Sequence, residues 1–279
     1  MSDPNEAVDW QGRAVSCKTC PEREIPELKC KLLHACMHDR YAKRVDRFFR
    51  WNPQIAKDYL QHGYFEVRAC AARYADIFHL PALMNDPDET VRWAVAQRLP
   101  QRYLLRMIHD PHREVRIRVA ARLDERNLSA MMHDADYYVR LEVVRRLPKG
   151  LLALMMHDSD VEVRRVVAKR IGVDALVKML QDDDPGVRLD AIERVPVSVL
   201  SMLVGDADWR IRYEVAARGS REAAIRLLAD ADYEVRRCAA ERLGKDEALS
   251  RQRWPGEGDN AHIDPPGLGA AHPLEFALL

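Results

Sequence analysis

A Val-Arg pair, once replaced by Ile-Arg, recurs every 24 residues without an insertion, and this period constrains the fold more than any other feature. The eight pairs begin at Val67, Val91, Val115, Val139, Val163, Val187, Ile211 and Val235. An aspartate stands 19 residues after the first seven of these positions. Repeats of this length are typical of solenoid proteins, in which each unit buries its apolar face against its neighbours.

Within each unit the apolar residues follow helical spacing. Counted from the Val as position 0, apolar or small residues stand at +4, +5 and +8, as in Val119, Ala120 and Leu123, which form one face of a helix. A second apolar set, such as Leu128, Met131 and Met132, leaves room for only about two turns. The pattern predicts an all-α solenoid in which each unit combines a long helix with a short α or 3-10 helix.

The arginine at position +1 is predicted to lie toward the buried side of the long helix, where an unpaired charge would be costly. The aspartate six residues before it can supply a partner. We therefore predict an internal structural ladder, with contact to nucleic acid as the alternative. The ladder comprises Arg92, Arg116, Arg140, Arg164, Arg188 and Arg212 with Asp86, Asp110, Asp134, Asp158, Asp182 and Asp206.

A second arginine column stands at position +7, at the margin of the apolar face. It comprises Arg98, Arg122, Arg146, Arg170, Arg194 and Arg218 and continues to Arg242. These side chains could pack over a neighbouring repeat or form a basic binding stripe. Packing is favoured because the chain holds 44 basic and 44 acidic residues, and no aromatic column for base stacking accompanies the arginines.

Four cysteines near the N-terminus follow the pattern C-x2-C-x9-C-x5-C: Cys17, Cys20, Cys30 and Cys36. Thiolates grouped in this way suit a tetrahedral zinc ion or an iron–sulfur cluster. Pro21, which follows a cysteine, and ten basic against five acidic residues over 13–50 favour iron. His34 and His38 keep a mixed Cys/His zinc site open, and disulfide pairing is the third alternative.

The sequence divides into four predicted segments. Residues 1–42 form the cysteine module, and residues 43–66 form a degenerate capping repeat with aromatic core positions. Residues 67–250 form the solenoid, and residues 251–279 form a poorly ordered tail rich in Pro and Gly. The segment Leu32–Asp39 echoes the repeats' L-x-x-M-M-H-D, which predicts that Cys36 lies on a short helix stacked on the first repeat.

Units of the form V-R-x-x-V-A-x-R-L, ended by M-M-H-D, together with the four cysteines, resemble the leucine-rich repeat variant family. The resemblance covers residues 17 to about 250. It implies a right-handed superhelix of alternating α and 3-10 helices and a 4Fe–4S cluster on the four cysteines. Family members with the cluster module resemble proteins found beside nitrogen-fixation functions in bacteria, and no catalytic residue comes with the resemblance.

Several function classes are disfavoured by the sequence. The N-terminus lacks the basic and apolar regions of a signal peptide, and no apolar run approaches the 18 or so residues of a membrane span, so we expect a cytoplasmic protein. No nucleophile–base pair, Gly-rich phosphate loop or small-molecule site is visible. We therefore expect a non-enzymatic scaffold or redox-linked binding protein with a protein partner. A nucleic-acid-binding regulator with a sensing cluster ranks second, and an electron-transfer protein third.

Overall fold

The structure is a computed structural model that describes residues 6–244. It is helical except for turns and two isolated β-bridges, Val8 with Ala14 and Lys31 with Ala35. Two compact units are distinguished, of which the first extends to Arg146 and the second begins at Leu147. The predicted tail 251–279 and the last six residues of the predicted solenoid lie outside the described residues. No helix among residues 6–244 is long and apolar enough to cross a bilayer.

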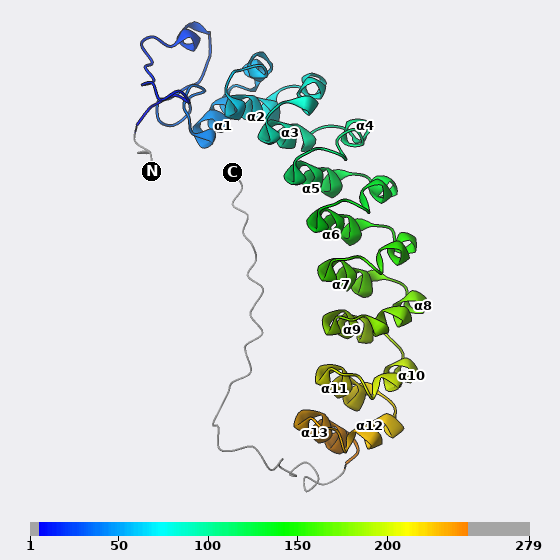
Figure 1. The fold of residues 1–279 in the computed structure, drawn as a ribbon. Coiled ribbons are helices and arrows are strands. Elements are labelled where there is room, and N and C mark those ends of the chain that lie inside the picture. The colour runs from blue at the N-terminus through cyan, green and yellow to red at the C-terminus, as the bar shows by residue number, and fades with distance from the viewer. Residues whose placement is uncertain (1–5, 245–279) are drawn as a thin grey trace. The chain divides into compact units, whose positions relative to one another are not determined.

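In the first unit the cysteine module precedes a stack of long helices with short elements along one edge (Figure 1). Residues 6–42 of the module contain one 3-10 turn, η1 (Pro21–Glu24). The long helices are α1 (Ala42–Trp51), α2 (Phe65–Tyr74), α3 (Glu89–Ala96), α5 (Arg113–Arg122) and α6 (Tyr137–Arg146). The short elements are η2 (Pro53–Tyr59), η3 (Ile77–Asn85), α4 (Gln101–Leu104) and η4 (Glu125–Met131).

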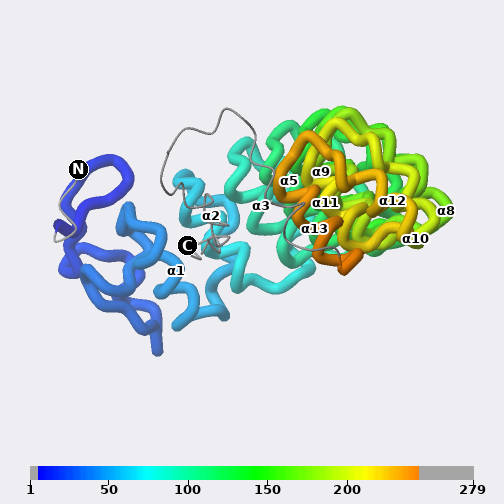
Figure 2. The backbone as a smooth tube through the Cα atoms, turned by 90° about the horizontal axis from the view of Figure 1, so that it is seen from below, coloured from blue at the N-terminus to red at the C-terminus, as the bar shows by residue number. Residues whose placement is uncertain are grey.

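The second unit repeats the same alternation. Its long helices are α7 (Val161–Arg170), α9 (Pro185–Ile192), α11 (Trp209–Arg218) and α13 (Tyr233–Arg242). Its short elements are η5 (Lys149–Met155), α8 (Val173–Leu176), η6 (Val177–Gln181), α10 (Val197–Leu200), η7 (Ser201–Leu203) and α12 (Arg221–Leu227). Figure 2 shows α9, α11 and α13 on one side of this unit and α8, α10 and α12 on the other. The prediction of a helical repeat with a short second element is confirmed.

Most of the long helices begin at an aspartate that caps them, whereas α1, α2 and α5 begin at Tyr41, Tyr64 and His112 without a side-chain cap. In α9, Asp184 Oδ1 accepts hydrogen bonds from the amides of Gly186 at 2.8 Å and Val187 at 3.2 Å, and Pro185 occupies the first turn. A side-chain cap satisfies amides that have no partner within the helix, and proline fits a position whose amide needs none. Equivalent caps stand at Asp88, Asp160, Asp208 and Asp232 and define where those helices begin.

The arginines at position +1 connect successive repeats, but through a different aspartate from the one expected. Arg92 Nε and Nη2 donate to both carboxylate oxygens of Asp110 at 2.8 and 3.0 Å, a residue 18 positions later. Its Nη1 donates to the backbone carbonyl of Asp86, six positions earlier, at 2.8 Å. The predicted side-chain pairing with the preceding aspartate is therefore wrong. Asp86 contributes its carbonyl to Arg92, while its carboxylate accepts from Arg68 at 2.8 Å.

The same arrangement recurs in both units. The further bidentate pairs are Arg116 with Asp134, Arg164 with Asp182, Arg188 with Asp206 and Arg212 with Asp230. Arg140 donates to the carbonyl of Asp134 at 2.8 Å, and the carbonyl of Asp158 accepts from Arg164 at 2.9 Å. We call these residues the ladder. Because each guanidinium satisfies a carboxylate and a carbonyl, the cost of placing it in a half-buried position is offset.

The second arginine column points at the ends of the preceding long helices. Arg122 Nη1 donates to the carbonyls of Ala96 at 2.7 Å and Leu99 at 3.0 Å. The last carbonyls of a helix lack partners within it and carry the negative end of the helix dipole, so a cation there is favourable. Arg98, Arg146, Arg170, Arg194, Arg218 and Arg242 make corresponding bonds. These bonds agree with the expectation that the second arginine column packs over neighbouring repeats, and its guanidiniums do not form a free basic stripe.

The ladder gives stability a defined pH dependence. Burial raises the pKa of Asp86, but hydrogen bonds from Arg68 and the Asp88 amide outweigh burial and hold this pKa below its ordinary value. The pKa values of Asp182 and Asp230 are lowered by the same kinds of hydrogen bond. A carboxyl whose pKa is lowered by folding stabilises the fold above its unfolded pKa, near 4, and loses that contribution as the pH falls through the folded pKa.

We expect the urea concentration at the midpoint of unfolding to stay level down to about pH 5 and to fall below about pH 4. Asp86→Asn should flatten that acid decline, and an unchanged slope would contradict this assignment.

Candidate metal centre

The four cysteines of the module come from separate turns of chain before α1. Cys20 is extended and directly precedes Pro21, which opens η1. The proline fixes the first φ angle of that turn, so the Cys20 side chain is placed at the start of a rigid element. Cys17 lies three residues earlier in the preceding turn.

Cys30 and Cys36 flank a tight turn. The amide of Lys31 donates to the carbonyl of Ala35 at 2.9 Å, and the amide of Ala35 donates back at 2.8 Å. The chain reverses through Leu33, which has a φ of 61°, a left-handed conformation that is uncommon outside glycine. Cys30 and Cys36 each stand next to one residue of this hydrogen-bonded pair, on the two arms of the turn. The predicted short helix carrying Cys36 is wrong, because residues 31–40 form turns rather than a helix.

All four cysteines line one small cavity. Its apolar walls include Leu28, Ala35, Met37 and Phe48, and Glu22 and His38 also border it. The four residues are free thiols. Cys36 is buried and Cys20 half-buried, whereas Cys17 and Cys30 are exposed. Four cysteines that line one largely apolar space supply the ligand set of a zinc ion or an iron–sulfur cluster.

The thiols would have to lose their protons to hold metal. Burial raises the pKa of the Cys36 thiol to about 11. Burial, followed by a hydrogen bond to Glu22, also raises the pKa of Cys20. Both groups are therefore protonated at neutral pH without metal, and metal binding must release their protons.

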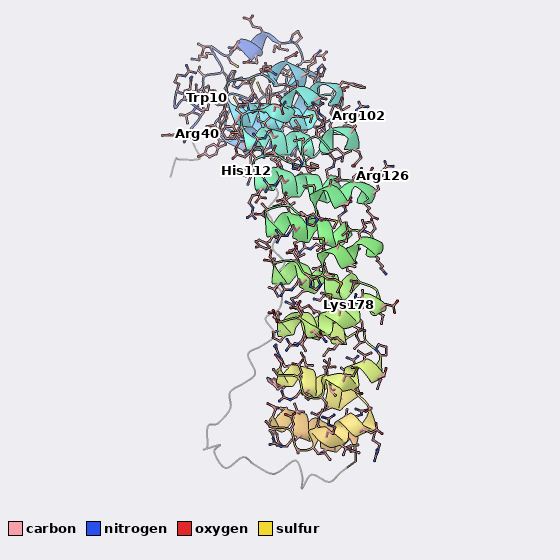
Figure 3. All side chains as sticks on the ribbon, turned by 45° about the vertical axis from the view of Figure 1, so that its right-hand side comes forward. Trp10, Arg40, Arg102, His112, Arg126 and Lys178 are labelled. Carbon is pink, nitrogen blue, oxygen red and sulfur yellow. The ribbon has the colours of Figure 1, made fainter. Side chains whose placement is uncertain are left out.

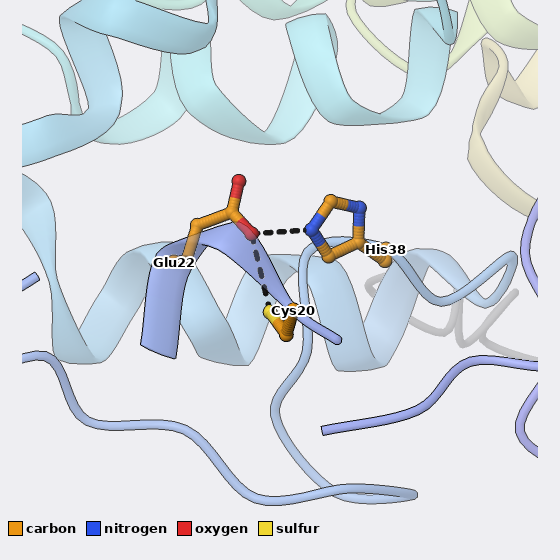
Figure 4. A group of neighbouring side chains, drawn as sticks. All are labelled: Cys20, Glu22 and His38. Carbon is orange, nitrogen blue, oxygen red and sulfur yellow. Dashed lines mark hydrogen bonds and ion pairs between the residues drawn. The ribbon is translucent and has the colours of Figure 1, made fainter. Parts of the chain in front are cut away.

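A carboxylate–imidazole pair borders the cysteines (Figure 4). Glu22 Oε2 lies 2.5 Å from His38 Nε2 and accepts a hydrogen bond from Cys20 Sγ at 3.2 Å. Glu22 Oε1 accepts from the Tyr59 hydroxyl at 3.3 Å. Burial raises the pKa of Glu22, but the bonds from His38 and Cys20 outweigh it and lower the pKa to about 2. The hydrogen bond to Glu22 correspondingly raises the pKa of His38.

Only part of this pair is foreseeable from the sequence. His38 stands two residues after Cys36 and is predicted as an alternative ligand. Glu22 carries no such signal, because its partners Tyr59 and His38 are far away in sequence. His34, the other predicted alternative, lies elsewhere: its Nδ1 is 2.9 Å from Arg47 Nη1, and its ring contacts Trp51.

The module contacts Asn52, between α1 and η2, and Tyr64, at the start of α2. The Asn52 side chain accepts from the Lys29 amide at 2.9 Å and donates to the Lys29 carbonyl at 2.8 Å, next to Cys30. Trp10 stacks on Tyr64 with ring centroids 5.7 Å apart. The cysteine-bearing chain therefore covers the aromatic end of the first unit, where Phe48 and Phe49 are fully buried.

The comparisons with known proteins match both parts of the chain. A family model described as "LRV protein FeS4 cluster" matches residues 7–58, which implies an iron–sulfur cluster in the module. A relative from Rhodobacter capsulatus, named "Uncharacterized 27.7 kDa protein in nifB 3'region", is 45% identical over 101 residues. That match covers 36% of this chain and only 41% of the relative's length.

A solved structure resembles most of the chain. It is described as a leucine-rich repeat variant with a novel repetitive protein structural motif, and it superposes with a TM-score of 0.76 at 40% sequence identity. The match covers 82% of this chain and 98% of that one. With this identity over nearly the whole of the solved protein, the chain belongs to the leucine-rich repeat variant family.

Proposed function

We propose that Cys17, Cys20, Cys30 and Cys36 hold a 4Fe–4S cluster, with a zinc ion as the alternative occupant. The single observation that carries this proposal is the convergence of all four cysteines on one cavity with mostly apolar walls. Four thiolates satisfy the four irons of such a cluster, one each. The basic surplus of the surrounding sequence supports the proposal because it would offset the cluster's negative charge.

We further propose that the protein is a non-enzymatic binding protein whose repeat surface contacts a protein partner. Stacked repeats supply an extended surface of the kind that solenoid proteins use for binding. The nitrogen-fixation context is part of this proposal and is supported by the name of the Rhodobacter relative, which refers to the nifB 3' region. The cytoplasm, where thiols stay reduced, is the compartment that suits free cysteines.

Two other functions rank lower. An electron-transfer role is favoured by the exposure of Cys17 and Cys30, because a cluster bound there would have an edge close to solvent. Nucleic-acid binding loses its main support, because the second arginine column donates to helix carbonyls, as Arg98 does to Ala72 at 2.7 Å.

Protein purified without oxygen should be brown and contain about four irons and four sulfides per chain. Cys17→Ser should lose most of the iron, and Cys70→Ser, in the core of α2, is the matched control that should keep it. A pull-down with both forms then tests whether the partner depends on the cluster. Colourless protein that carries one zinc would overturn the cluster assignment. A partner that binds the parent protein and Cys17→Ser equally would show that partner binding does not depend on the cluster.

A further inference from the structure

The Cys20–Glu22–His38 group has the geometry of a metal site on its own. The Sγ, carboxylate oxygen and imidazole nitrogen of these residues all lie within 4.8 Å of one another. The three side chains point toward one another in Figure 4. Ligand atoms about 2.0–2.3 Å from one zinc ion lie roughly 3–4 Å apart, so modest adjustments of these side chains would place all three on a single ion.

We propose that Cys20, Glu22 and His38 form a mononuclear site for a borderline-soft divalent cation such as Zn²⁺. One sulfur, one nitrogen and one carboxylate oxygen suit a borderline-soft ion better than Mg²⁺ or Ca²⁺, which take oxygen ligands. Three protein ligands leave a fourth tetrahedral position for water. Binding would release to solvent the thiol proton that Cys20 donates to Glu22. It would also displace from His38 Nε2 the proton that bonds to Glu22, so that the nitrogen lone pair is free for the cation.

Contacts around the group set it apart from an ordinary surface cluster. Glu22 is 9% exposed, so its carboxylate is already removed from bulk solvent at a cost that the partners offset. The Tyr59 hydroxyl bonds to the carboxylate oxygen that faces away from His38. Tyr59 itself packs against Phe49, with ring centroids 5.6 Å apart. Such second contacts orient a ligand and raise metal affinity.

Given the proposed cluster assignment, on which this inference rests, the two metal states exclude each other because both use the Cys20 sulfur. A protein in which the mononuclear site is filled has lost one cluster ligand, and a protein with the cluster has no free Cys20. The module would then exist in a cluster-bearing form and a single-cation form, selected by the metals available when the chain folds.

Cobalt is the probe that separates the sites, because a thiolate bound to Co²⁺ gives a charge-transfer band and tetrahedral Co²⁺ gives strong visible bands. Apo protein should bind one Co²⁺ per chain with both signals. Glu22→Gln and His38→Gln should weaken cobalt binding at least about 10-fold, in the range expected for lost metal-site contacts. Cys17→Ser and Cys30→Ser should bind it as the parent does.

His34→Gln is the matched control, because His34 lies in the same module but bonds to Arg47. His38→Cys should restore binding with a stronger charge-transfer band, which guards against a His38→Gln variant that merely misfolds. Cobalt binding that depends on Cys17 and Cys30 but not on Glu22 and His38 would overturn the inference and leave the cluster intact. If Cys17→Ser keeps its iron and also binds cobalt normally, the proposed cluster would be contradicted and the cation site would stand.

Discussion

Replacing Arg92 with alanine should lower the free energy of unfolding by about 3–5 kcal/mol, the usual cost of breaking a buried ion pair. The side chains of Arg92 and Asp110 are only 10% and 4% exposed. Removal of the guanidinium takes two hydrogen bonds from the buried Asp110 carboxylate, which keeps only the bond from the His112 amide at 2.9 Å, and it also leaves the Asp86 carbonyl without its donor. Urea unfolding followed by circular dichroism would measure the change.

The double variant Arg92→Ala with Asp110→Ala distinguishes a true pair from two independent residues. It should lower the free energy of unfolding by clearly less than the sum of the two single changes, because Asp110→Ala removes the carboxylate that Arg92→Ala leaves without its partner. Arg126→Ala is the control: its side chain is 81% exposed, points away from the ribbon in Figure 3, and should change stability by less than about 0.5 kcal/mol. Additive single effects would show that the ladder is not energetically coupled.

The repeat itself is predictable from the sequence, because identical core positions recur in every unit. Val115, Val119, Ala120 and Leu123 are predicted to face inward and are fully buried. The shortness of the second element follows from arithmetic, since 24 residues cannot hold two ordinary helices and two turns.

The partners of the long side chains are not predictable in this way. Nearness in sequence favours Asp86 as the partner of Arg92, yet the guanidinium extends along the stack to Asp110, 18 residues later. A side chain as long as arginine reaches a neighbouring repeat as easily as its own loop, so sequence spacing cannot choose between them. The way in which successive repeats stack decides which aspartate pairs with each arginine, and this stacking is given only by the three-dimensional structure.

The error at Cys36 has a different cause. The residues around it copy the repeat motif, but only its second half packs: Met37 is 2% exposed, whereas Leu32 and Leu33 are 37% and 40% exposed. The two hydrogen bonds between Lys31 and Ala35 and the left-handed Leu33 close a turn instead. This turn places Cys30 and Cys36 on its two arms, so the departure from the repeat serves the metal centre.

Removing the metal should raise hydrogen exchange at the near end of the first unit and leave distant repeats protected. Without metal bonds the chain bearing Cys17 to Cys36 is held mainly by scattered contacts, such as the Asn52 bonds to Lys29. When that chain opens, Phe48, which lines the cysteine cavity, loses its cover, at a cost of about 1.5–3 kcal/mol. Metal bonds oppose that opening, and loss of even about 3 kcal/mol of their stabilisation should make the opening about 100-fold more frequent.

Hydrogen exchange read by mass spectrometry should therefore speed up from residue 17 to about 90 in metal-free protein, while repeats from Val139 onward keep their protection. The reason is that the stability of stacked repeats is close to a sum of unit and nearest-neighbour terms, so the loss of a terminal cover is felt mainly by the adjoining units. Cys70→Ser, treated identically, controls for loss of a thiol without loss of metal. Uniform deprotection would mean that the repeats unfold as one cooperative block. Unchanged exchange over α1 and η2 would mean that the contacts of Asn52, Tyr59 and Tyr64 hold the module in place without metal, and the cluster would then be free to serve electron transfer rather than folding.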